Sequence, residues 1–463
     1  MSVSDKVINQ DAGHLLDTAH RAADEFSLFT KEQVESIVRQ VAEAAEKKAK
    51  FYAEWSVRET GFGDAGDKHK KNMRNSIGML DEFKVEDYVN PVVDHENKII
   101  SFPKPAGVVV ALVPCTNPVA TIYYKAMMSL MTRNAMILCP HPSAKNCCVD
   151  AADLVAEIAE KAGAPKGTIQ VLREPSIPLV NQLLQSDRTS LILATGGPAM
   201  VRASYSSGNP ALGVGPANVG CYVHKSADVA TAGANIVFSN SFDNSLPCTC
   251  ESVVVADHEI SNTLKEMMTQ SNAYFVAGDE EKALREFLFA EAESNRAAVG
   301  KSAEWIAEQA GFSVPAGTKS LVVEISSIGP LEPLSKEKMF PVLGYITVDG
   351  PQQAIETVHA MLAMMGKGHS AVIHANDPSV VASYGAALPV CRIAVNTPGA
   401  AGSAGVTTNL SRGSVIGTGF FGRSSVDDNV GPKHLIQWTR VAYHSDPSVV
   451  IGDMDEALEE MGY

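Results

Sequence analysis

Short apolar runs alternate with longer amphipathic segments along most of this chain. In residues 11–60, apolar side chains recur at helical spacing among many Ala, Glu and Lys residues, which predicts helices. From residue 107, the runs GVVVALVP, NAMILCP, TIQVL, TSLILATGG and VGCYVH are separated by segments with a helical pattern. Apolar runs between helices are typical of a parallel sheet that is covered on both faces.

The alternation resumes after residue 250 with the runs SVVVAD, SLVVEIS, LGYITVD, SAVIHA and CRIAVN. Helices are expected across 259–310 and 351–365, so these residues predict a second α/β unit. Because ligands bind at the carboxyl ends of the strands in such sheets, residues that directly follow the strands are the first candidates for a site. Residues 397–431, rich in Gly, Ser and Thr, are interpreted as ordered loops over that site or, alternatively, as a flexible linker.

Residues 86–104 have a different pattern. The β-type runs VNPVVD and KIISF flank the polar turn HEN, which predicts a hairpin ahead of the main sheet. Such a hairpin would serve as an arm for pairing with another subunit.

Composition narrows the class of protein. The 463 residues exceed one ordinary core, and a net charge of −15 disfavours a nucleic-acid partner or an anionic membrane surface. No apolar run reaches the ~20 residues that span a bilayer, and the start lacks the basic and apolar regions of a secretory signal. The eight cysteines do not form a disulfide scaffold or a zinc-ribbon spacing. We therefore expect free thiols, no metal site and a cytoplasmic location.

The stretch SNSFDNSLPCTCESVVVADHE (239–259) contains the candidate nucleophile. Cys248 falls on a predicted loop at the junction of the two α/β units, where a cleft is expected. A thiolate there would attack a carbonyl and hold the acyl group as a thioester. Cys250 lies at the strand entrance and is expected to pack. For an arbitrary cysteine, a small buried core residue is the commoner situation.

Three further motifs each have two interpretations. The Asn117 amide, just past the first strand, would donate to an oxyanion or act as a helix cap. Gly196 and Gly197 lie between a strand and a helix, where backbone amides meet phosphates, although the motif is weak by itself. Glu337, ahead of a strand in EKMFPVLGY, is by itself a surface carboxylate.

In this combination and order, the motifs resemble those of the aldehyde dehydrogenase family over roughly residues 10–440. They are Asn117-Pro118, the turn Thr195-Gly196-Gly197, Cys248, and Glu337 with Pro341-Val342. The resemblance implies an α/β fold with two Rossmann-like parallel-sheet domains and a β-hairpin oligomerisation arm. It implies a nicotinamide-cofactor-binding domain (1–238, with the arm at about 86–104), a catalytic domain with Cys248 (239–410), and a C-terminal segment (411–463) that supplies substrate-site loops and oligomer contacts.

One departure from the family pattern concerns the acceptor of the acyl group. Hydrolytic members have ELGGK where this chain has LGVGPANVG (212–220), so Gly213 stands where their general-base glutamate would be. With FDN before the cysteine and GPKHL near the end, the chain resembles the CoA-acylating branch, and especially the aldehyde dehydrogenase half of bifunctional aldehyde–alcohol dehydrogenases. The implied mechanism is attack by Cys248, oxyanion stabilisation by Asn117 and the Cys248 backbone amide, and acyl transfer to coenzyme A.

The resemblance also implies a nicotinamide cofactor. NAD-specific relatives often carry a glutamate where Ser143 stands in CPHPSAKN (139–146), whereas His141 and Lys145 nearby suit a 2′-phosphate. NADP is therefore at least as plausible as NAD, unless Lys145 is only a solvated turn residue. The residues expected at the cofactor are Pro114, Thr116, His141, Ser143, Lys145, Thr195, Gly196, Gly197, Gly213 and Glu337.

For the substrate we expect a small aldehyde. GTGFFGRSS resembles a loop of acylating sulfoacetaldehyde dehydrogenases, in which Arg423 would pair with the sulfonate; a surface arginine is the alternative. His369 in GKGHSAVIH matches a histidine that recurs in the acylating branch, and would shape the substrate or CoA site or simply lie in the core. Acetaldehyde or another short-chain aldehyde, an acyl-phosphate reductase on the same fold, a hydrolytic enzyme with another base and a catalytically silent member are the alternatives. A homodimer or homotetramer is expected.

Overall fold

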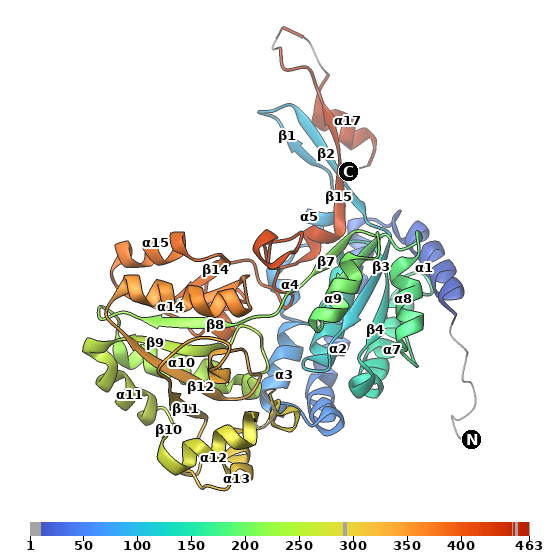
Figure 1. Cartoon of the computed structure of the whole chain (residues 1–463). Helices are drawn as coiled ribbons and strands as arrows, with labels where there is room; N and C mark the ends of the chain where they lie inside the picture. The colour runs from blue at the N-terminus through green and yellow to red at the C-terminus, as the bar shows by residue number, and fades with distance from the viewer. Residues whose placement is uncertain (1–10, 290–293, 447, 450–451, 463) are drawn as a thin grey trace, which may run out of the picture.

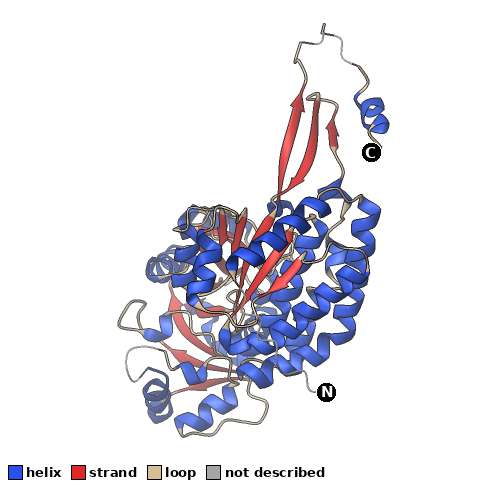
Figure 2. Ribbon diagram, turned by 90° about the vertical axis from the view of Figure 1, so that its right-hand side faces the viewer, coloured by secondary structure: helices blue, strands red, loops and turns tan. Residues whose placement is uncertain are grey.

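The computed structural model describes residues 11–289, 294–446, 448–449 and 452–462. It has two α/β lobes that lie side by side and an arm that projects from the amino-terminal lobe (Figures 1 and 2). The family fold predicted from the sequence is confirmed. Among the described residues, no helix is long and apolar enough to cross a bilayer.

The amino-terminal lobe is built on a five-stranded parallel sheet with the order β5-β4-β3-β6-β7. Side chains of the central strand β3 alternate between the two faces of the sheet. Val109 and Ala111 pack with α2, α6 and α7, and Val110 packs with α1 and α8 on the other face. Because both faces are buried, every position of the strand is apolar. The strands are β3 (Val108–Val113), β4 (Ala135–Pro140), β5 (Ile169–Val171), β6 (Leu191–Ala194) and β7 (Ala211–Gly213).

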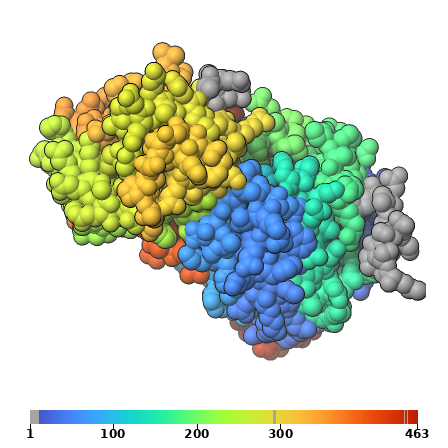
Figure 3. Space-filling model, turned by 90° about the horizontal axis from the view of Figure 1, so that it is seen from below, coloured from blue at the N-terminus to red at the C-terminus, as the bar shows by residue number. Residues whose placement is uncertain are grey.

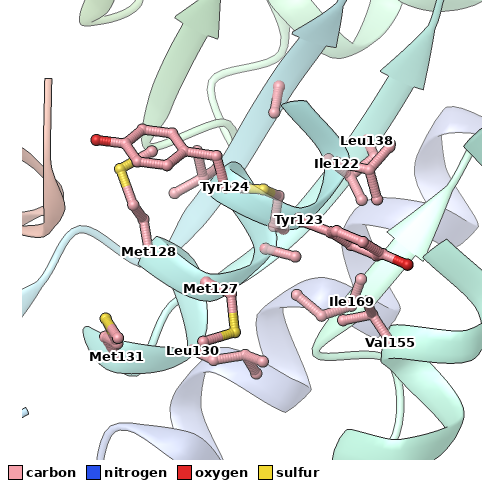
Figure 4. Close-up of a cluster of buried hydrophobic side chains, with 14 of the residues drawn as sticks. Ile122, Tyr123, Tyr124, Met127, Met128, Leu130, Met131, Leu138, Val155 and Ile169 are labelled. Atoms are coloured by element: carbon pink, nitrogen blue, oxygen red, sulfur yellow. The ribbon is translucent and has the colours of Figure 1, made fainter. Parts of the chain in front are cut away.

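Helices cover both faces of this sheet. The predicted helical region 11–60 forms two helices, and the second begins with a capping box between Thr30 and Gln33 and ends at Gly61 in the left-handed conformation. Helix α6 is buried along its whole length, and Figure 4 shows Tyr123, Ile122 and Leu138 from this core. The helices are α1 (Ala12–Phe26), α2 (Lys31–Thr60), α3 (Ala65–Arg74), α4 (Met79–Glu82), α6 (Pro118–Met131), α7 (Lys145–Lys161), α8 (Ile177–Gln185) and α9 (Pro198–Tyr205).

The second lobe contains a seven-stranded parallel sheet with the order β10-β11-β12-β9-β8-β13-β14. Helices α10 and α11 cover one face, and α12 to α15 cover the other. The strands are β8 (Val219–Val223), β9 (Glu251–Asp257), β10 (Ala273–Val276), β11 (Ser320–Glu324), β12 (Val342–Val348), β13 (Gly368–His374) and β14 (Val390–Val395). The helices are α10 (Val229–Ser241), α11 (Ser261–Gln270), α12 (Gly278–Phe289), α13 (Ala303–Ala310), α14 (Pro351–Met364), α15 (Pro378–Ala387) and α16 (Gly399–Gly402).

Two details of this layout differ from the sequence analysis. The region 259–310 is not wholly helical, because residues 273–276 form the edge strand β10 between α11 and α12. The chain passes from the first sheet to the second between β7 and β8, ahead of the boundary that we set at residue 238. Strand β8 and helix α10 therefore pack in the second lobe.

The arm is a three-stranded antiparallel sheet with the order β1-β2-β15. The predicted hairpin consists of β1 (Val92–Asp94) and β2 (Ile99–Pro105), preceded by the short helix α5 (Glu86–Val89). The third strand, β15 (Ile436–Ala442), comes from the C-terminal segment and pairs with β2 along its full length. Helix α17 (Met454–Glu460) packs on this sheet through Met454 and Leu458.

Candidate active site

Cys248 lies on a turn between the short 3-10 helix η2 (Phe242–Ser245) and β9. Its partly exposed side chain packs against a core cluster of each lobe, so the thiol lies at the junction of the lobes. Cys250 is only 6% exposed and is a core residue. A small cavity beside the turn is lined by Ser245, Pro247 and Glu337, among others.

Cys248 and Glu337 lie at the amino ends of strands of the second sheet. The sequence analysis instead expected site residues at the carboxyl ends of the strands. Cys248 precedes β9, and Glu337 precedes β12. His369 and Arg392 lie near the beginnings of β13 and β14. The rule that ligands bind at carboxyl ends therefore describes the candidate residues of the first sheet but not those of the second.

The turn ahead of Cys248 has an uncommon backbone conformation. Asp243, Asn244 and Ser245 have φ values of 47°, 54° and 64°, a region that residues other than glycine rarely occupy. The Asp243 backbone N–H donates to Asp67 Oδ2 at 2.8 Å, and Asn244 Nδ2 donates to the Gly300 carbonyl at 2.9 Å. Contacts from both lobes therefore hold this left-handed segment in place.

The carboxylate of Asp243 is fully buried and is held by several donors. Its Oδ1 accepts the backbone N–H of Asp64 at 2.7 Å. Its Oδ2 accepts from Lys68 Nζ at 3.1 Å and from Lys71 Nζ. Gly63 passes so close that a Cβ there would lie 2.0 Å from Asp243 Oδ1, so only glycine fits at that position.

Asn117 stands at the N-cap of α6, but its side chain makes no capping hydrogen bond. Its Oδ1 accepts from Lys71 Nζ, while its Nδ2 has only a long contact of 3.5 Å to Thr116 Oγ1. The amide therefore retains a donor that could meet an oxyanion. Lys68 donates to the Thr116 carbonyl at 2.8 Å and fixes the same loop.

Sequence reasoning missed Lys68, Lys71 and Asp243. In the sequence, GDKHKKN has the pattern of a solvent-exposed charged helix, and only Asp243 fell within a motif that we singled out, FDN. The single-sequence pattern carries no signal for the burial of the two lysines, which depends on how α3 packs between the lobes (Figure 1).

Burial dominates the electrostatics of the thiol. Burial and, to a smaller extent, the Glu337 carboxylate raise the pKa of Cys248, Arg392 and Lys71 lower it, and the net result is a pKa of about 12. Burial also raises the pKa of Glu337 to about 7, against the hydrogen bond from the Ala217 backbone N–H and the charge of Lys338. The site thus holds a largely protonated thiol beside a carboxyl group that titrates near neutrality.

Gly213 ends β7 and is enclosed on the side where a side chain would project. A Cβ there would lie 2.6 Å from Tyr205 Cε2 and 2.9 Å from Val201 Cγ1. The Gly213 N–H donates to the Tyr205 hydroxyl at 2.7 Å, and its carbonyl accepts from Ser424 Oγ at 2.8 Å. The position has no carboxylate, and its neighbours leave no space for one.

The other residues expected at the cofactor follow neighbouring strands of the first sheet. Pro114 and Thr116 follow β3, Ser143 follows β4, and Thr195 follows β6. Because β4, β3 and β6 are adjacent and parallel, their carboxyl ends form one continuous edge with the switch point between β3 and β6.

Two features of this edge suit an extended phosphate-bearing ligand. Thr195 Oγ1 is buried and has no hydrogen-bond partner among the residues that the structure describes, and Gly196 and Gly197 beside it are exposed. Gly197 is the N-cap of α9, and a helix N-terminus favours the binding of a phosphate group. The residues present therefore fit a dinucleotide or another phosphate-bearing cofactor.

The residues predicted to lie at the adenosine ribose and its 2′-phosphate already interact with other residues of the protein. Lys145 Nζ forms an ion pair with Glu174 at 2.6 Å. His141 Nδ1 accepts the Ser143 N–H at 3.1 Å. The charge of Lys145 is thus compensated by Glu174, which sequence reasoning did not single out.

His369 and Arg423 have contrasting surroundings. His369 is fully buried, its Nδ1 pairs with Ser370 Oγ at 2.8 Å, and its Nε2 has no hydrogen-bond partner. Burial and Arg392 lower the pKa of His369 to about 3, so the ring is neutral. Arg423 is exposed in the left-handed conformation, beside the exposed side chains of Phe420 and Phe421.

Arg392, another residue missed from the sequence, ties the Arg423 loop to the second lobe. Its guanidinium donates to the carbonyls of His369, Gly417 and Asp427 at 2.7–2.8 Å. Its charge also acts on Cys248. The loop that carries Arg423 is therefore fixed to β14 at one side and to Gly213 at the other.

Comparison with known proteins identifies the family. The model of the aldehyde dehydrogenase family matches residues 5–408. The bifunctional aldehyde–alcohol dehydrogenase AdhE of Escherichia coli K12 is 36% identical over 96% of this chain and 52% of that protein. The chain therefore spans about half the length of the aldehyde–alcohol dehydrogenases that it matches. It belongs to the aldehyde dehydrogenase family, and the predicted resemblance to the CoA-acylating branch is confirmed.

Other relatives match over most of their length. The acetylating succinate-semialdehyde dehydrogenase of Clostridium kluyveri is 32% identical over 94% of this chain and 96% of that protein. A sulfoacetaldehyde dehydrogenase of an Acholeplasma species is 34% identical, with coverages of 85% and 82%. The crystal structure of an acetylating aldehyde dehydrogenase from Geobacillus thermoglucosidasius has a TM-score of 0.91 at 35% identity and covers 95% of this chain and 98% of that one.

Proposed function

We propose that this protein oxidises a small aldehyde to an acyl-CoA through a thioester on Cys248. The proposal rests on Cys248 at the junction of the lobes and on Lys71, which binds both Asp243 in the turn ahead of Cys248 and the oxygen of the Asn117 amide, leaving the amide nitrogen available to donate. A thiol nucleophile and a preorganised donor are the two groups that acyl chemistry through a tetrahedral adduct requires.

Different residues of this chain would carry out the nucleophilic attack, the stabilisation of the oxyanion and the proton transfer. The Cys248 sulfur attacks the aldehyde carbon, and Asn117 Nδ2 with the Cys248 backbone N–H stabilises the resulting oxyanion. A nicotinamide bound along the edge formed by β4, β3 and β6 would supply the oxidant. We further propose that Glu337, whose pKa burial raises to about 7, accepts the proton of the attacking thiol.

Coenzyme A is the proposed acyl acceptor because the site lacks a carboxylate at Gly213. Tyr205 and Val201 fill the space into which a glutamate there would project. Acyl transfer to a thiol needs no such base, since the thiolate is itself a good nucleophile. We therefore propose that release of the thioester depends on CoA.

The aldehyde is proposed from the relatives and from one loop. Two of the relatives that match over most of their length are named for succinate semialdehyde and sulfoacetaldehyde, both of which carry an anionic group. Arg423 has an exposed side chain, forms no ion pair within the described part of the chain, and lies on a loop that Ser424 fixes to Gly213. We propose sulfoacetaldehyde as the first substrate to test, with acetaldehyde as the alternative, and Arg423 as the group that pairs with the sulfonate.

The deciding measurement is the initial rate of nicotinamide reduction, followed at its near-ultraviolet absorbance. Each aldehyde is tested with NAD⁺ or NADP⁺, with and without CoA, and separately with phosphate in place of CoA. Strict dependence on CoA is the expected result. Equal rates without CoA would favour hydrolysis with Glu337 as the base, and a requirement for phosphate would identify an acyl-phosphate enzyme instead.

A further inference from the structure

Helix α3 connects the turn of the nucleophile to Asn117 through two buried cations. Lys68 and Lys71 lie three residues apart on α3, so they point from the same face of the helix, and their side chains are 4% and 7% exposed. Both bind Oδ2 of Asp243, and Lys71 also donates to Oδ1 of Asn117. One ammonium group therefore touches both the turn that precedes Cys248 and the amide proposed for the oxyanion.

The contact between Lys71 and Asn117 determines which way the amide faces. An ammonium group can only donate hydrogen bonds, so it accepts only the oxygen of the amide as a partner. The amide nitrogen must then lie on the other side, where, within the described ranges of the chain, it has only the long contact to Thr116 Oγ1. Without Lys71, the amide could rotate and present its oxygen to the substrate, where two oxygens would repel each other.

We propose that Lys71 is a positioning residue for catalysis, which holds Asn117 with its nitrogen aimed at the oxyanion, and that Asp243 supplies the charge that keeps Lys71 in place. The proposal rests on two parts of the proposed function, the acyl adduct on Cys248 and the role of Asn117 as an oxyanion donor.

The arrangement distinguishes Lys71 from an ordinary buried ion pair. Asp243 already has Lys68 and the Asp64 N–H as donors, so its negative charge is compensated without Lys71. Lys68 makes its second contact with the Thr116 backbone carbonyl, which carries no chemistry. Of the two lysines, Lys71 alone reaches the Asn117 side chain.

The test uses p-nitrophenyl acetate, which isolates the first half of the reaction. The Cys248 sulfur attacks the ester carbonyl through a tetrahedral oxyanion, the bond to the aryl oxygen breaks, and p-nitrophenolate leaves with the electron pair while the thiol proton passes to Glu337 and then to solvent. The burst of p-nitrophenolate reports this step without nicotinamide or CoA. A full-length chain that shows no burst overturns the proposal, because Cys248 would then form no adduct.

We expect Lys71→Met to lower the burst rate constant about 100-fold, the loss expected when one oxyanion donor is removed, with the concentration of ester at half-maximal rate unchanged. Lys71→Arg, which keeps a donor-only cation, should retain the rate within about fivefold. The matched control is Lys70→Met on the same helix, because Lys70 is 67% exposed and pairs with Asp67; it should stay within about twofold. A Lys71→Met rate within threefold of the wild type would overturn the proposal.

A double-variant cycle separates positioning from a purely structural role. If Lys71 acts through Asn117, Lys71→Met combined with Asn117→Ala should be no more than about threefold slower than Asn117→Ala alone. If the fold losses in burst rate constant of the two single variants multiply in the double variant, Lys71 acts independently of Asn117 and the proposal is refuted. If Lys71→Met does not fold, Lys71→Gln replaces it, since a neutral amide both donates and accepts and no longer fixes the orientation of Asn117; we then expect at least a tenfold loss.

Failure of this proposal and failure of the proposed function give different results. Aldehyde oxidation that does not depend on CoA would overturn the proposed function. It would not affect the result of the double-variant cycle measured with p-nitrophenyl acetate. A multiplicative cycle together with strict CoA dependence would overturn only the role of Lys71.

Discussion

At the scale of single residues, Asn117 carries the most direct prediction. Asn117→Ala removes one proposed oxyanion donor and leaves the Cys248 backbone N–H as the other, so turnover should fall by about 10²–10³. The cofactor dissociation constant should stay unchanged, because the backbone of the 114–117 loop is still held by Lys68. Steady-state kinetics with a cofactor titration checks both expectations. Near-normal turnover would remove Asn117 from the mechanism.

The reactivity of Cys248 should depend steeply on pH. Because burial raises its pKa to about 12, the thiolate fraction grows about tenfold per pH unit throughout the neutral and mildly alkaline range. Iodoacetamide labelling of Cys248, followed by mass spectrometry with Cys248→Ala as the blank, should therefore rise between pH 7 and pH 10 without a plateau. Glu337→Gln removes a negative charge that raises this pKa, so it should accelerate labelling at pH 9. A plateau near pH 8 would contradict the electrostatic account.

The ion pair of Lys145 with Glu174 should limit the affinity for a 2′-phosphate. In Glu174→Gln the lysine loses its 2.6 Å partner and becomes available to another anion. We expect the dissociation constant of NADP⁺ to fall about fivefold relative to that of NAD⁺, the scale of one charge interaction near a surface. Calorimetric titration of both cofactors tests this, and equal changes for the two would show that Lys145 does not face the phosphate.

Residues with a family motif could be predicted from the sequence, whereas residues that act through packing could not. Cys248 and Asn117 follow recognisable turns, so the sequence alone singled them out. Lys71 lies in a segment with the pattern of a solvated helix, and it becomes part of the site only because α3 is covered by both lobes. Glu174 and Arg392 were missed for the same reason, since their partners come from distant segments.

At the scale of elements, the packing of α9 against β7 explains why position 213 is glycine. A Cβ at Gly213 would lie 2.6 Å from Tyr205 Cε2, so Gly213→Ala should lower the free energy of unfolding by about 1–3 kcal/mol. Thermal unfolding measures this, with Gly196→Ala as the control because its new Cβ comes no closer than 3.8 Å to Met200. Gly213→Glu should likewise be destabilised and should gain no CoA-independent turnover. A stable Gly213→Glu that releases acid without CoA would contradict this interpretation.

The strand pattern predicted most elements but not the short or peripheral ones. Long apolar runs such as β3 and β9 are buried on both faces and are easily recognised. Strand β10 has only four residues at the edge of its sheet, and β7 has three, so neither produces a run that outweighs the neighbouring helical pattern. Which end of the second sheet faces the site depends on how the lobes are joined, and periodicity carries no such information.

At the scale of the whole molecule, the two lobes meet along α3, the loop between α2 and α3, and the nucleophile turn. Seen from below, the segment that contains α3 packs directly against the second lobe (Figure 3). The edge proposed for the cofactor is formed by the carboxyl ends of one sheet, and the candidate nucleophile lies at the amino ends of the other. The reacting groups are therefore assembled only when both lobes are folded, which explains why the network around Asp243 draws on α3 and η2 together.

The exposed arm predicts how copies of this chain assemble. Among the described residues its own core consists of Ile100, Met454 and Leu458, and its edge strand β15 exposes most of its length, with Val441 42% exposed. Because a projecting sheet with unpaired edges is a template for another chain, we expect a homodimer or homotetramer that uses this arm.

Val441→Glu should therefore dissociate the assembly without lowering the unfolding temperature of the lobes. Leu331→Glu makes a similar exchange at a fully exposed apolar position outside the arm and should leave the assembly intact. Sedimentation velocity of the three proteins at one concentration gives the answer. A monomeric wild type, or dissociation by Leu331→Glu alone, would show that the arm does not mediate assembly.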